Sequence, residues 1–497
     1  MTDRLSSESS RSTDELCFLA AHELRKAYRA RELSPVEVVD AVLDRIARVD
    51  SRLNSFVTLL PDDARAAARR AEKEMMSSGP EELGLLHGIP VTVKDLTETA
   101  GVRTTFGSVL HKDNVPDRDA IGWARMKRAG SILLGKTTTP DFGMLGVTQS
   151  TLTGVTSNPW NTTRTAGGSS GGAAASVVAG LGHLAWGSDG GGSIRIPAAC
   201  CGAVGLKASP GRIPLYLEEG NLFETVSTVG PITRNVTDCA LLLAATAGPD
   251  RRDPVSLPAS PVDYVAATLE ASIEGLRIGY SVDLGQALIS KEVAAAFERA
   301  LDVLRDLGAK VEPVALELPD AIEYFLHYWG PGIALGVDAM MAAGAGPDQF
   351  PPATLELAGL GREVTLTEAI HCQTQVRTEL AVALTGALTD HDLLACPTMP
   401  LTAFPHPGDV GGNTEIDGVS VGRPSLDFHR LTEPFSHAGL PALTVPAGFD
   451  AEGLPVGLQL VGSFHEDDLV LRAGAAYEAA TPWSDRRPQL DHEGDRR

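Results

Sequence analysis

Apolar and polar positions follow two patterns along the chain, and the first pattern is helical. The residues Ser34-Pro35-Val36-Glu37 form a capping box with proline at the first helical position, which predicts a helix start. Apolar side chains then recur at helical spacing, at Val39, Leu43, Ile46 and Val49. Residues 65–76 are rich in Ala, Arg and Glu and predict a second helix. We therefore expect a helical layer over residues 21–80.

Beyond residue 86 the pattern changes to short apolar or β-branched runs, which are typical of buried strands. These runs cover residues 89–93, 131–134, 184–187, 276–280, 393–396, 442–445 and 456–461. Helical stretches lie between them, such as residues 290–307, where apolar side chains share one face and Gly308 follows as a stop signal. This alternation predicts an α/β protein, a sheet with helices on both faces, and the length allows one or two domains.

Composition limits the class of partner. Hydrophobic residues make up 43% of the 497-residue chain and charged residues 21%, which is enough apolar material for a large core. The formal net charge of −22 repels phosphate backbones and anionic lipids, so we expect neither a nucleic acid nor a membrane as partner. The longest apolar stretch, residues 171–187, falls short of the ~20 residues of a membrane-spanning helix.

The chain start and the cysteines bear on the cellular compartment. The start is polar and lacks the basic and apolar regions of a signal peptide, so we expect a disordered tail over residues 1–20. Six cysteines are scattered without CxxC pairs, which favours neither a disulfide framework nor a zinc site. These features favour a cytoplasmic protein with reduced thiols.

Two glycine-flanked serines carry the candidate chemistry. Ser169 lies in the run GGSSGG at residues 167–172, and Ser193 ends the run GGGS at residues 190–193. Such runs are usually flexible linkers, but a linker would not lead into the apolar helix expected after residue 172. Flanking glycines let backbone N–H groups approach a ligand closely and turn inward together, as an oxyanion hole requires. A serine at the end of such a run is therefore a candidate nucleophile.

A serine nucleophile needs a base, and two residues are candidates. His183 lies alone in an apolar stretch, which is typical of a core histidine. Lys94 closes the apolar run at residues 89–93, where a desolvated ammonium without a partner is costly. Such a lysine more often reaches solvent or pairs with its neighbour Asp95. The two serines make Lys94 the stronger candidate base.

The residues around these positions resemble the amidase signature family. The resemblance rests on HGIPVTVKD at residues 87–95, on the GGSSGG run and on residues 188–207, and it covers roughly residues 20–490. It implies a single large α/β/α amidase signature domain over residues 21–497 with a mixed twisted sheet. It also implies a triad in which neutral Lys94 is the base, Ser169 relays the proton and Ser193 is the nucleophile.

The resemblance carries further expectations about this triad. The N–H groups of Gly190, Gly191 and Gly192 would form the oxyanion hole. Lys94 can act as a base near neutral pH only if its pKa falls from the ordinary ~10.4 to about 7, and burial is the expected cause. A cis peptide before Ser169 and a structural role for Arg195 are implied as well.

Small departures from the family pattern concern the acyl pocket. Ser188 replaces a frequent threonine, Gly190 adds a third glycine, and Thr138 and Asp141 replace a frequent Asn and Glu. None of these touches the triad. Together with the small Gly143, the extra glycine is expected to alter the shape of the acyl pocket.

Two other motif matches point to different functions. Residues 130–137 satisfy the P-loop expression GxxxxGK[ST], but their interior is an apolar β-run, whereas a phosphate loop follows its strand and opens a helix. Residues 167–171 satisfy the GxSxG elbow of α/β-hydrolases, which needs a buried strand before it. The polar turn at residues 158–164 occupies that place instead. Neither function is favoured.

An amidotransferase subunit is the alternative to a free enzyme. Amidotransferase A subunits resemble the chain equally in the triad region, and they release ammonia from glutamine for a partner subunit that acts on charged tRNA. A glutamine site needs a positioned charge pair, whereas the segment at about 315–375 is apolar and contains Tyr324, Phe325, Tyr328 and Trp329. The helical spacing of these aromatic residues is equally compatible with a place in the core. If they line the pocket instead, their rings favour a hydrophobic or aryl substrate.

The sequence thus predicts an amidase that cleaves carboxylic amide C–N bonds through an acyl-enzyme on Ser193. The segment at about 315–375 is expected to vary and to cover the substrate, with Gly143, Tyr324 and Tyr328 as substrate-binding residues. Ester and carbamate (urethane) hydrolysis share the tetrahedral intermediate and stay open, as does the glutamine-hydrolysing A subunit of a tRNA-dependent amidotransferase. We expect a small-molecule substrate, a monomer or homodimer, and no metal or organic cofactor.

Overall fold

A large mixed sheet forms the centre of the protein. The computed structural model describes residues 12–215, 225–269 and 271–490. Within these residues, eleven strands form one sheet in the order β1-β3-β2-β6-β8-β7-β14-β15-β11-β9-β10. These strands are β1 (Phe56–Leu59), β2 (Pro90–Lys94), β3 (Ile132–Thr137), β6 (Leu184–Asp189), β7 (Val204–Lys207), β8 (Thr228–Thr233), β9 (Arg277–Tyr280), β10 (Lys310–Pro313), β11 (Leu393–Pro397), β14 (Ala442–Phe449) and β15 (Pro455–Val461). Two small hairpins, β4 (Gln149–Ser150) with β5 (Gly154–Val155) and β12 (Glu415–Ile416) with β13 (Val419–Ser420), lie outside it.

The sheet is buried on both faces. β2 pairs in parallel with β3 and β6, and β9 pairs in parallel with β10 and β11, whereas the strands between them are antiparallel. Successive side chains of β6 point to opposite faces, so Leu184 and Trp186 join one apolar core and Ala185 joins another. The predicted mixed sheet between helical layers is therefore confirmed.

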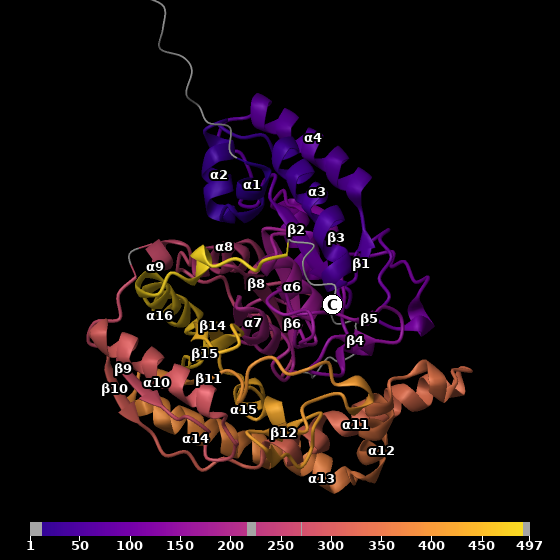
Figure 1. Cartoon of the computed structure of the whole chain (residues 1–497), viewed down its shortest axis with the longest axis vertical. Coiled ribbons are helices and arrows are strands. Elements are labelled where there is room, and N and C mark those ends of the chain that lie inside the picture. The colour runs from indigo at the N-terminus through magenta and orange to yellow at the C-terminus, as the bar shows by residue number, and fades with distance from the viewer. Residues whose placement is uncertain (1–11, 216–224, 270, 491–497) are drawn as a thin grey trace, which may run out of the picture.

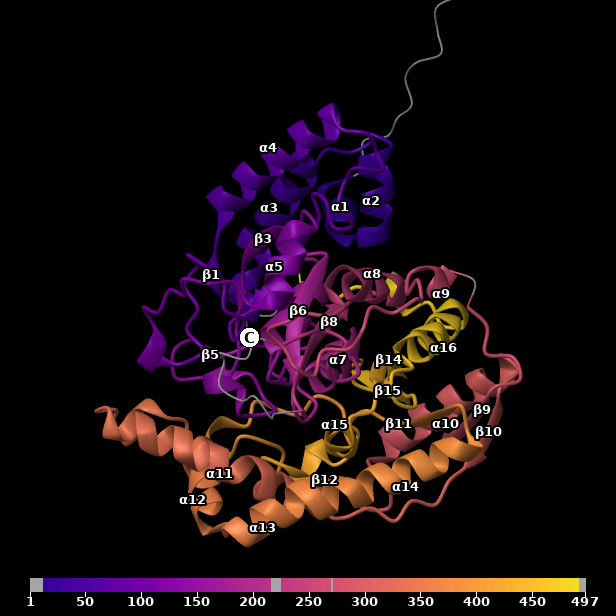
Figure 2. The same cartoon turned by 180° about the vertical axis from the view of Figure 1, so that it is seen from behind.

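Helices cover the two faces and both ends of the sheet. α6 and α7 contribute to the core that holds Ala185, whereas α5, α8 and α16 contribute to the core that holds Trp186. The helices are α1 (Thr13–Phe18), α2 (Ala21–Arg29), α3 (Pro35–Leu53), α4 (Pro61–Ser77), α5 (Ile121–Arg128), α6 (Gly171–Val178), α7 (Arg195–Cys201), α8 (Val236–Thr246), α9 (Ala266–Leu269), α10 (Lys291–Asp306), α11 (Ala321–Ala342), α12 (Pro352–Glu363), α13 (Leu366–His371), α14 (Arg377–Asp390), α15 (Glu433–Ala438) and α16 (Asp467–Ala480). Figures 1 and 2 show α1–α4 gathered beside β1–β3, and α11–α13 as a separate helical group away from them. Among the described helices, none has both the length and the apolar character needed to cross a bilayer.

The helical N-terminal layer forms largely as the sequence predicts. α3 begins at Pro35, where the Ser34 side chain accepts from the Val36 N–H and the capping box with Glu37 is complete. The expected disordered tail is wrong at its C-terminal end, because residues 13–18 form α1 and bury Cys17. A second capping box, from Ser12 to Glu15, and packing against α3 account for this helix. Residues 1–11 lie outside the described residues.

Candidate active site

The sheet brings two buried charged groups to one edge. β2 and β6 are neighbouring parallel strands, and Lys94 and Asp189 are their last residues. The carboxyl ends of parallel strands meet at the same edge of a sheet, where α/β proteins place their ligand sites. Both side chains are fully buried. The next residues after Asp189 are the glycine run that ends at Ser193.

Lys94 has the environment of a general base. Its Nζ lies 2.6 Å from Ser169 Oγ and 2.9 Å from Ser188 Oγ. Burial lowers the pKa of Lys94 to about 7, although the nearby Asp189 carboxylate raises it. A large fraction of Lys94 is therefore neutral at neutral pH, as a base requires. Both the lowered pKa and its cause, burial, are those expected from the sequence.

Ser169 and Ser193 occupy facing loops. Ser169 lies two residues before α6, is buried, and follows a cis Gly168–Ser169 peptide, as the resemblance implied. The N–H of the next residue, Ser170, donates to the Ser193 carbonyl over 3.1 Å and ties the two loops together. Ser193 is half-buried and lines the same cavity as Ser169. The structure thus joins Lys94 to Ser169 directly and places Ser193 at the cavity wall beside them.

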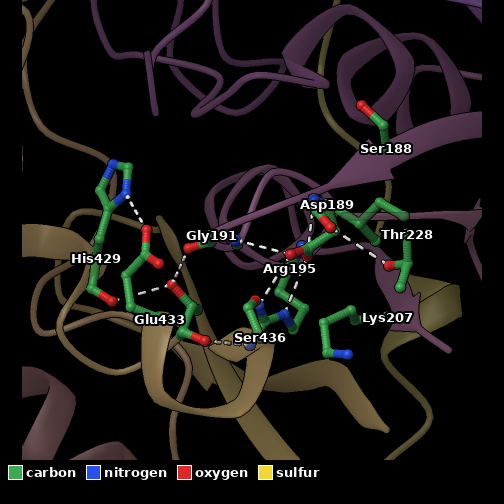
Figure 3. Close-up of polar contacts among 12 residues, drawn as sticks. Ser188, Asp189, Gly191, Arg195, Lys207, Thr228, His429, Glu433 and Ser436 are labelled. Carbon is green, nitrogen blue, oxygen red and sulfur yellow. Dashed lines mark hydrogen bonds and ion pairs between the residues drawn. The ribbon is translucent and has the colours of Figure 1, made fainter. Parts of the chain in front are cut away.

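A buried ion pair holds the glycine loop. Asp189 accepts from the Arg195 guanidinium at 2.9 and 3.0 Å and from the N–H groups of Gly192 and Ile194 at 2.7 and 3.1 Å. Burial would raise the pKa of Asp189, but the Arg195 guanidinium lowers it to about 2. Arg195 also donates to the Thr432 carbonyl, Gln459 Oε1 and Ser436 Oγ. Its role is structural, as expected, and Figure 3 shows it beneath the loop.

The predicted oxyanion donors need one correction. The N–H of Gly192 is already bonded to Asp189, so Gly192 is not free to hold an oxyanion. Within the described part of the chain, the N–H groups of Gly191 and Ser193 have no protein acceptor. The sequence does not reveal the bond between the Gly192 N–H and Asp189. Asp189 begins the same loop, and the conformation of the turn determines which N–H group of the loop points toward its carboxylate.

A cavity of about 690 Å³ lies over these loops. Gly143 and Tyr328, two of the predicted substrate-binding residues, line it. A Cβ on Gly143 would lie 3.3 Å from Ser169 Oγ, so this glycine keeps space open next to Ser169. The lining is Leu96, Phe142, Gly143, Met144, Leu145, Ser169, Ser188, Asp189, Gly190, Gly191, Ser193, Ser227, Phe325, Tyr328, Trp329, Pro331, Gly332, Ile333, Ala369, Gln373, Arg377, His429 and Glu433.

Tyr324, the third predicted substrate-binding residue, is outside the lining. Its side chain is 1% exposed and packs in a separate core cluster with Ala321, Cys372 and Leu380. Tyr324 and Tyr328 are four residues apart on α11, but the helix turns the first toward the core and the second toward the cavity. Tyr324 is therefore a core residue rather than a cavity residue.

Sequence reasoning missed the polar groups at one end of the cavity. Glu433, at the start of α15, lies between His429 and His437, and Arg377 comes from the start of α14. The signal was present, since the two histidines stand four residues before and after Glu433. Figure 3 shows His429 and Glu433 on one side of Gly191 and the Asp189–Arg195 pair on the other. Among the described residues, no His, Cys, Asp and Glu group has a metal-holding arrangement.

The rival motifs have structural roles. Gly135, Lys136 and Thr137 lie within β3, so the P-loop match is a strand, and Lys136 Nζ donates to the Thr99 and Thr104 hydroxyls. His183 is buried with Nε2 2.9 Å from the Leu16 carbonyl oxygen, and burial lowers its pKa to about 3. Neither Lys136 nor His183 lines the cavity.

Comparison with known proteins gives consistent results. The model of a family described as Amidase matches residues 37–471. An acylamidase of Rhodococcus erythropolis is 37% identical over 478 residues, which is 95% of this chain and 98% of that protein. The A subunit of the glutamyl-tRNA(Gln) amidotransferase of Thermosynechococcus vestitus is 37% identical over 492 residues, 94% of this chain and 99% of that protein.

Solved structures agree on the fold. The crystal structure of a bacterial aryl acylamidase of the amidase signature family superposes with a TM-score of 0.87 at 32% identity, over 94% of this chain and 97% of that one. The structure of 6-aminohexanoate cyclic dimer hydrolase gives a TM-score of 0.83 at 30% identity, over 96% of this chain and all of that one.

Proposed function

The chain belongs to the amidase signature family, and we propose that it hydrolyses the C–N bond of carboxylic amides with hydrophobic or aryl groups through an acyl-enzyme on Ser193. One observation carries the proposal. The buried Lys94, with a pKa of about 7, donates to Ser169 at the edge of a cavity that Ser193 also lines. A neutral amine bonded to a hydroxyl is the arrangement that activates a serine without histidine.

In the proposed mechanism the proton moves through Ser169. Neutral Lys94 takes the Ser169 proton, Ser169 takes the Ser193 proton, and Ser193 Oγ attacks the carbonyl carbon. The relay then runs in reverse and delivers a proton to the departing nitrogen. Water repeats the attack on the acyl-Ser193 ester, releases the acid and restores the hydroxyl. Such proton transfer contributes typically ~10²–10⁴-fold to a rate.

The glycine loop supplies the oxyanion hole in this proposal. The N–H groups of Gly190, Gly191 and Ser193 are the candidate donors, because Gly192 already donates to Asp189. Asp189 and Arg195 hold the loop rigid, so the donors need no rearrangement when the negative charge develops. One such donor is worth about 3–4 kcal/mol of transition-state stabilisation.

The cavity supports a hydrophobic or aryl substrate. Its volume of about 690 Å³ falls within the usual range for small-molecule sites. Phe142, Phe325, Tyr328 and Trp329 present aromatic surface for the substrate, while Gly143 leaves room beside the triad. Esters and carbamates pass through the same tetrahedral intermediate, so urethane hydrolysis is a natural extension of the proposed activity.

A glutamine-hydrolysing A subunit is the second candidate. Its support is the pair of charged groups, Arg377 and Glu433, that line the cavity together with the apolar residues. An amino-acid amide carries an ammonium and a carboxylate that these groups would match. The A subunit of Thermosynechococcus vestitus is also 37% identical to the chain, as the acylamidase is.

The test is a panel of substrates on the purified chain. Turnover of an aryl anilide, an aryl ester, an aryl carbamate and glutamine is measured, with Ser193→Ala as the control for each. Faster Ser193-dependent hydrolysis of the anilide than of glutamine supports the first proposal. Glutamine hydrolysis alone supports the second, and no Ser193-dependent turnover of any of the four contradicts both.

A further inference from the structure

At the polar end of the catalytic cavity, the carboxylate of Glu433 lies between two imidazoles, of which His429 lines the cavity and His437 lies behind it. Glu433 Oε1 lies 3.4 Å from His429 Nδ1, and Glu433 Oε2 lies 3.2 Å from His437 Nε2. Glu433 is 1% exposed, and it lines the cavity together with His429. Aromatic side chains pack against this cluster, since the rings of Phe325 and Phe428 contact His429.

Several polar atoms of this cluster lack hydrogen bonds. His429 Nε2 and His437 Nδ1 are buried and have no hydrogen-bond partner in the described part of the chain, and the 3.2 Å contact of Glu433 Oε2 with His437 Nε2 lacks hydrogen-bond geometry. Buried polar atoms in folded proteins are almost always paired, because an unpaired one loses its interaction with water without compensation. His429 and Glu433 line the cavity, so a ligand bound there can supply the partner that their buried atoms lack.

The carboxylate of Glu433 is the negative charge that the cluster offers a ligand when both imidazoles are neutral. Over the described ranges, Glu433 contacts the two histidines, and no lysine or arginine is paired with it. Burial raises the pKa of Glu433, but the two histidines lower it below its ordinary value, so the carboxylate stays ionised near neutral pH. Arg377 lines the same cavity but does not pair with Glu433. Its guanidinium donates to the His437 carbonyl and to Thr225 Oγ1.

The cluster also lies against the loop that carries the nucleophile. A Cβ added to Gly191 would come 1.9 Å from Glu433 Oε1, so the carboxylate packs directly on the Cα of this glycine. Thr432 Oγ1 donates to the Gly191 carbonyl over 2.7 Å and fixes this contact. A substrate held by Ser193 therefore extends within reach of Glu433.

We propose that Glu433, held between His429 and His437, is a subsite for a protonated amino group of the substrate. This inference rests on the proposed function, because it assigns a substrate class to the same cavity. An ammonium carries three N–H donors, which match the carboxylate and the unpartnered His429 Nε2. Charge-assisted hydrogen bonds of this kind are about twice as strong as neutral ones. The preferred substrates are amides whose apolar body ends in an amine.

Binding to the Ser193→Ala protein tests the subsite without turnover. The probes are benzamides that carry a para ω-aminoalkyl chain, the n-alkyl chain of equal length, or the ω-carboxyalkyl chain, each in short, medium and long forms. Calorimetry gives Kd for each probe with Glu433 intact, with Glu433→Gln added, and with Glu356→Gln added. Glu356 is exposed on α12, so its change removes the same charge away from the cavity.

We expect the amine to bind about tenfold or more tightly than its alkyl counterpart at the best chain length. Glu433→Gln should remove this advantage, and Glu356→Gln should retain it. His429→Phe, which keeps an aromatic ring but removes Nε2, should weaken the advantage and serves if Glu433→Gln does not fold.

Three results would overturn the subsite. An equal loss of affinity for charged and neutral probes in Glu433→Gln would assign Glu433 to loop support alone. Tightest binding of the carboxylate probe would assign the cavity to an anion, and an amine advantage that survives Glu433→Gln would place the ammonium elsewhere. Amine selectivity in binding combined with no hydrolysis by the wild-type chain would contradict the proposed function and leave the subsite standing.

Discussion

Lys94 Nζ and Ser169 Oγ lie 2.6 Å apart, and neither side chain is open to solvent. Burial disfavours the ammonium form of lysine, so the contact joins a partly neutral amine to a hydroxyl rather than an ammonium ion to an acceptor. The distance and the lowered pKa together support the proposal that Lys94 is the base of the site. Activity should therefore depend on the protonation state of Lys94.

We predict that kcat/KM for an anilide rises with pH through a midpoint near 7. Burial lowers the pKa of Lys94 to about 7, so the amine is protonated and inactive below that pH and neutral and active above it. A pH–rate profile between about pH 5 and 9 checks this.

The control for the pH profile is a second buried lysine. Burial also lowers the pKa of Lys207 to about 7, so Lys207 is another group that a midpoint near 7 could report. Lys207→Met should keep the midpoint, whereas Lys94→Ala should lose it along with most of the activity. A midpoint that disappears only in Lys207→Met would remove Lys94 as the base.

The Asp189–Arg195 ion pair should be essential for both stability and activity. Asp189→Asn leaves the Arg195 guanidinium buried without its counterion, and breaking a buried pair in this way costs about 3–5 kcal/mol. Urea unfolding measures the loss, and Ser193-dependent turnover should fall because the glycine loop loses its anchor. Asp338→Asn, which breaks an exposed pair with Arg362, should change stability little. Equal effects of the two substitutions would disprove the anchoring role.

Space next to the triad depends on Gly143. Gly143 has a φ of +70°, and a Cβ there would lie 2.6 Å from Leu96 Cδ1 and 3.3 Å from Ser169 Oγ. Gly143→Ala should therefore lower kcat by roughly tenfold to a hundredfold, since small displacements of reacting groups are costly. Gly154 has a φ of +74° but open space around its Cβ, so Gly154→Ala applies the same backbone strain and should keep full activity. If both variants lose activity equally, strain rather than crowding is responsible.

Two tyrosines on α11 should behave differently. Tyr328 lines the cavity, so Tyr328→Ala should raise KM for aryl substrates with a modest effect on stability. Tyr324 is a core residue, so Tyr324→Ala should cost about 3–5 kcal/mol of unfolding free energy and leave KM unchanged in the folded fraction. Thermal unfolding and steady-state kinetics on both variants separate the effects. A raised KM for Tyr324→Ala at unchanged stability would return that residue to the substrate site.

The strands that sequence reveals are those with unbroken apolar runs. β2, β6, β11 and β15 are buried on nearly every residue, so their composition marks them. β8 contains Gly230 and Pro231, which argue against a strand when seen in isolation. β10, with Lys310 and Glu312 exposed at the sheet edge, lacks an apolar pattern because one side of it has no partner strand among the described residues.

Some residues of the candidate site could be predicted from the sequence, and others could not. Glycine runs and a lysine at the end of a strand are local features, so Lys94, Ser169 and Ser193 are visible along the chain. Glu433 and Arg377 reach the cavity from α15 and α14, far from the triad in sequence, and only the folded chain brings them there. Likewise, the turn geometry that commits the Gly192 N–H to Asp189 is a property of the loop in space.

The central claim is that Ser193 is the nucleophile of this enzyme. Intact-mass analysis after treatment with a fluorophosphonate tests it most directly, with Ser193→Ala and Ser169→Ala treated in parallel. We predict a single adduct on the wild-type chain, none on Ser193→Ala, and slow but detectable labelling of Ser169→Ala, since that variant keeps the nucleophile and loses the relay. An adduct of unchanged yield on Ser193→Ala would contradict the assignment of Ser193 and the mechanism built on it.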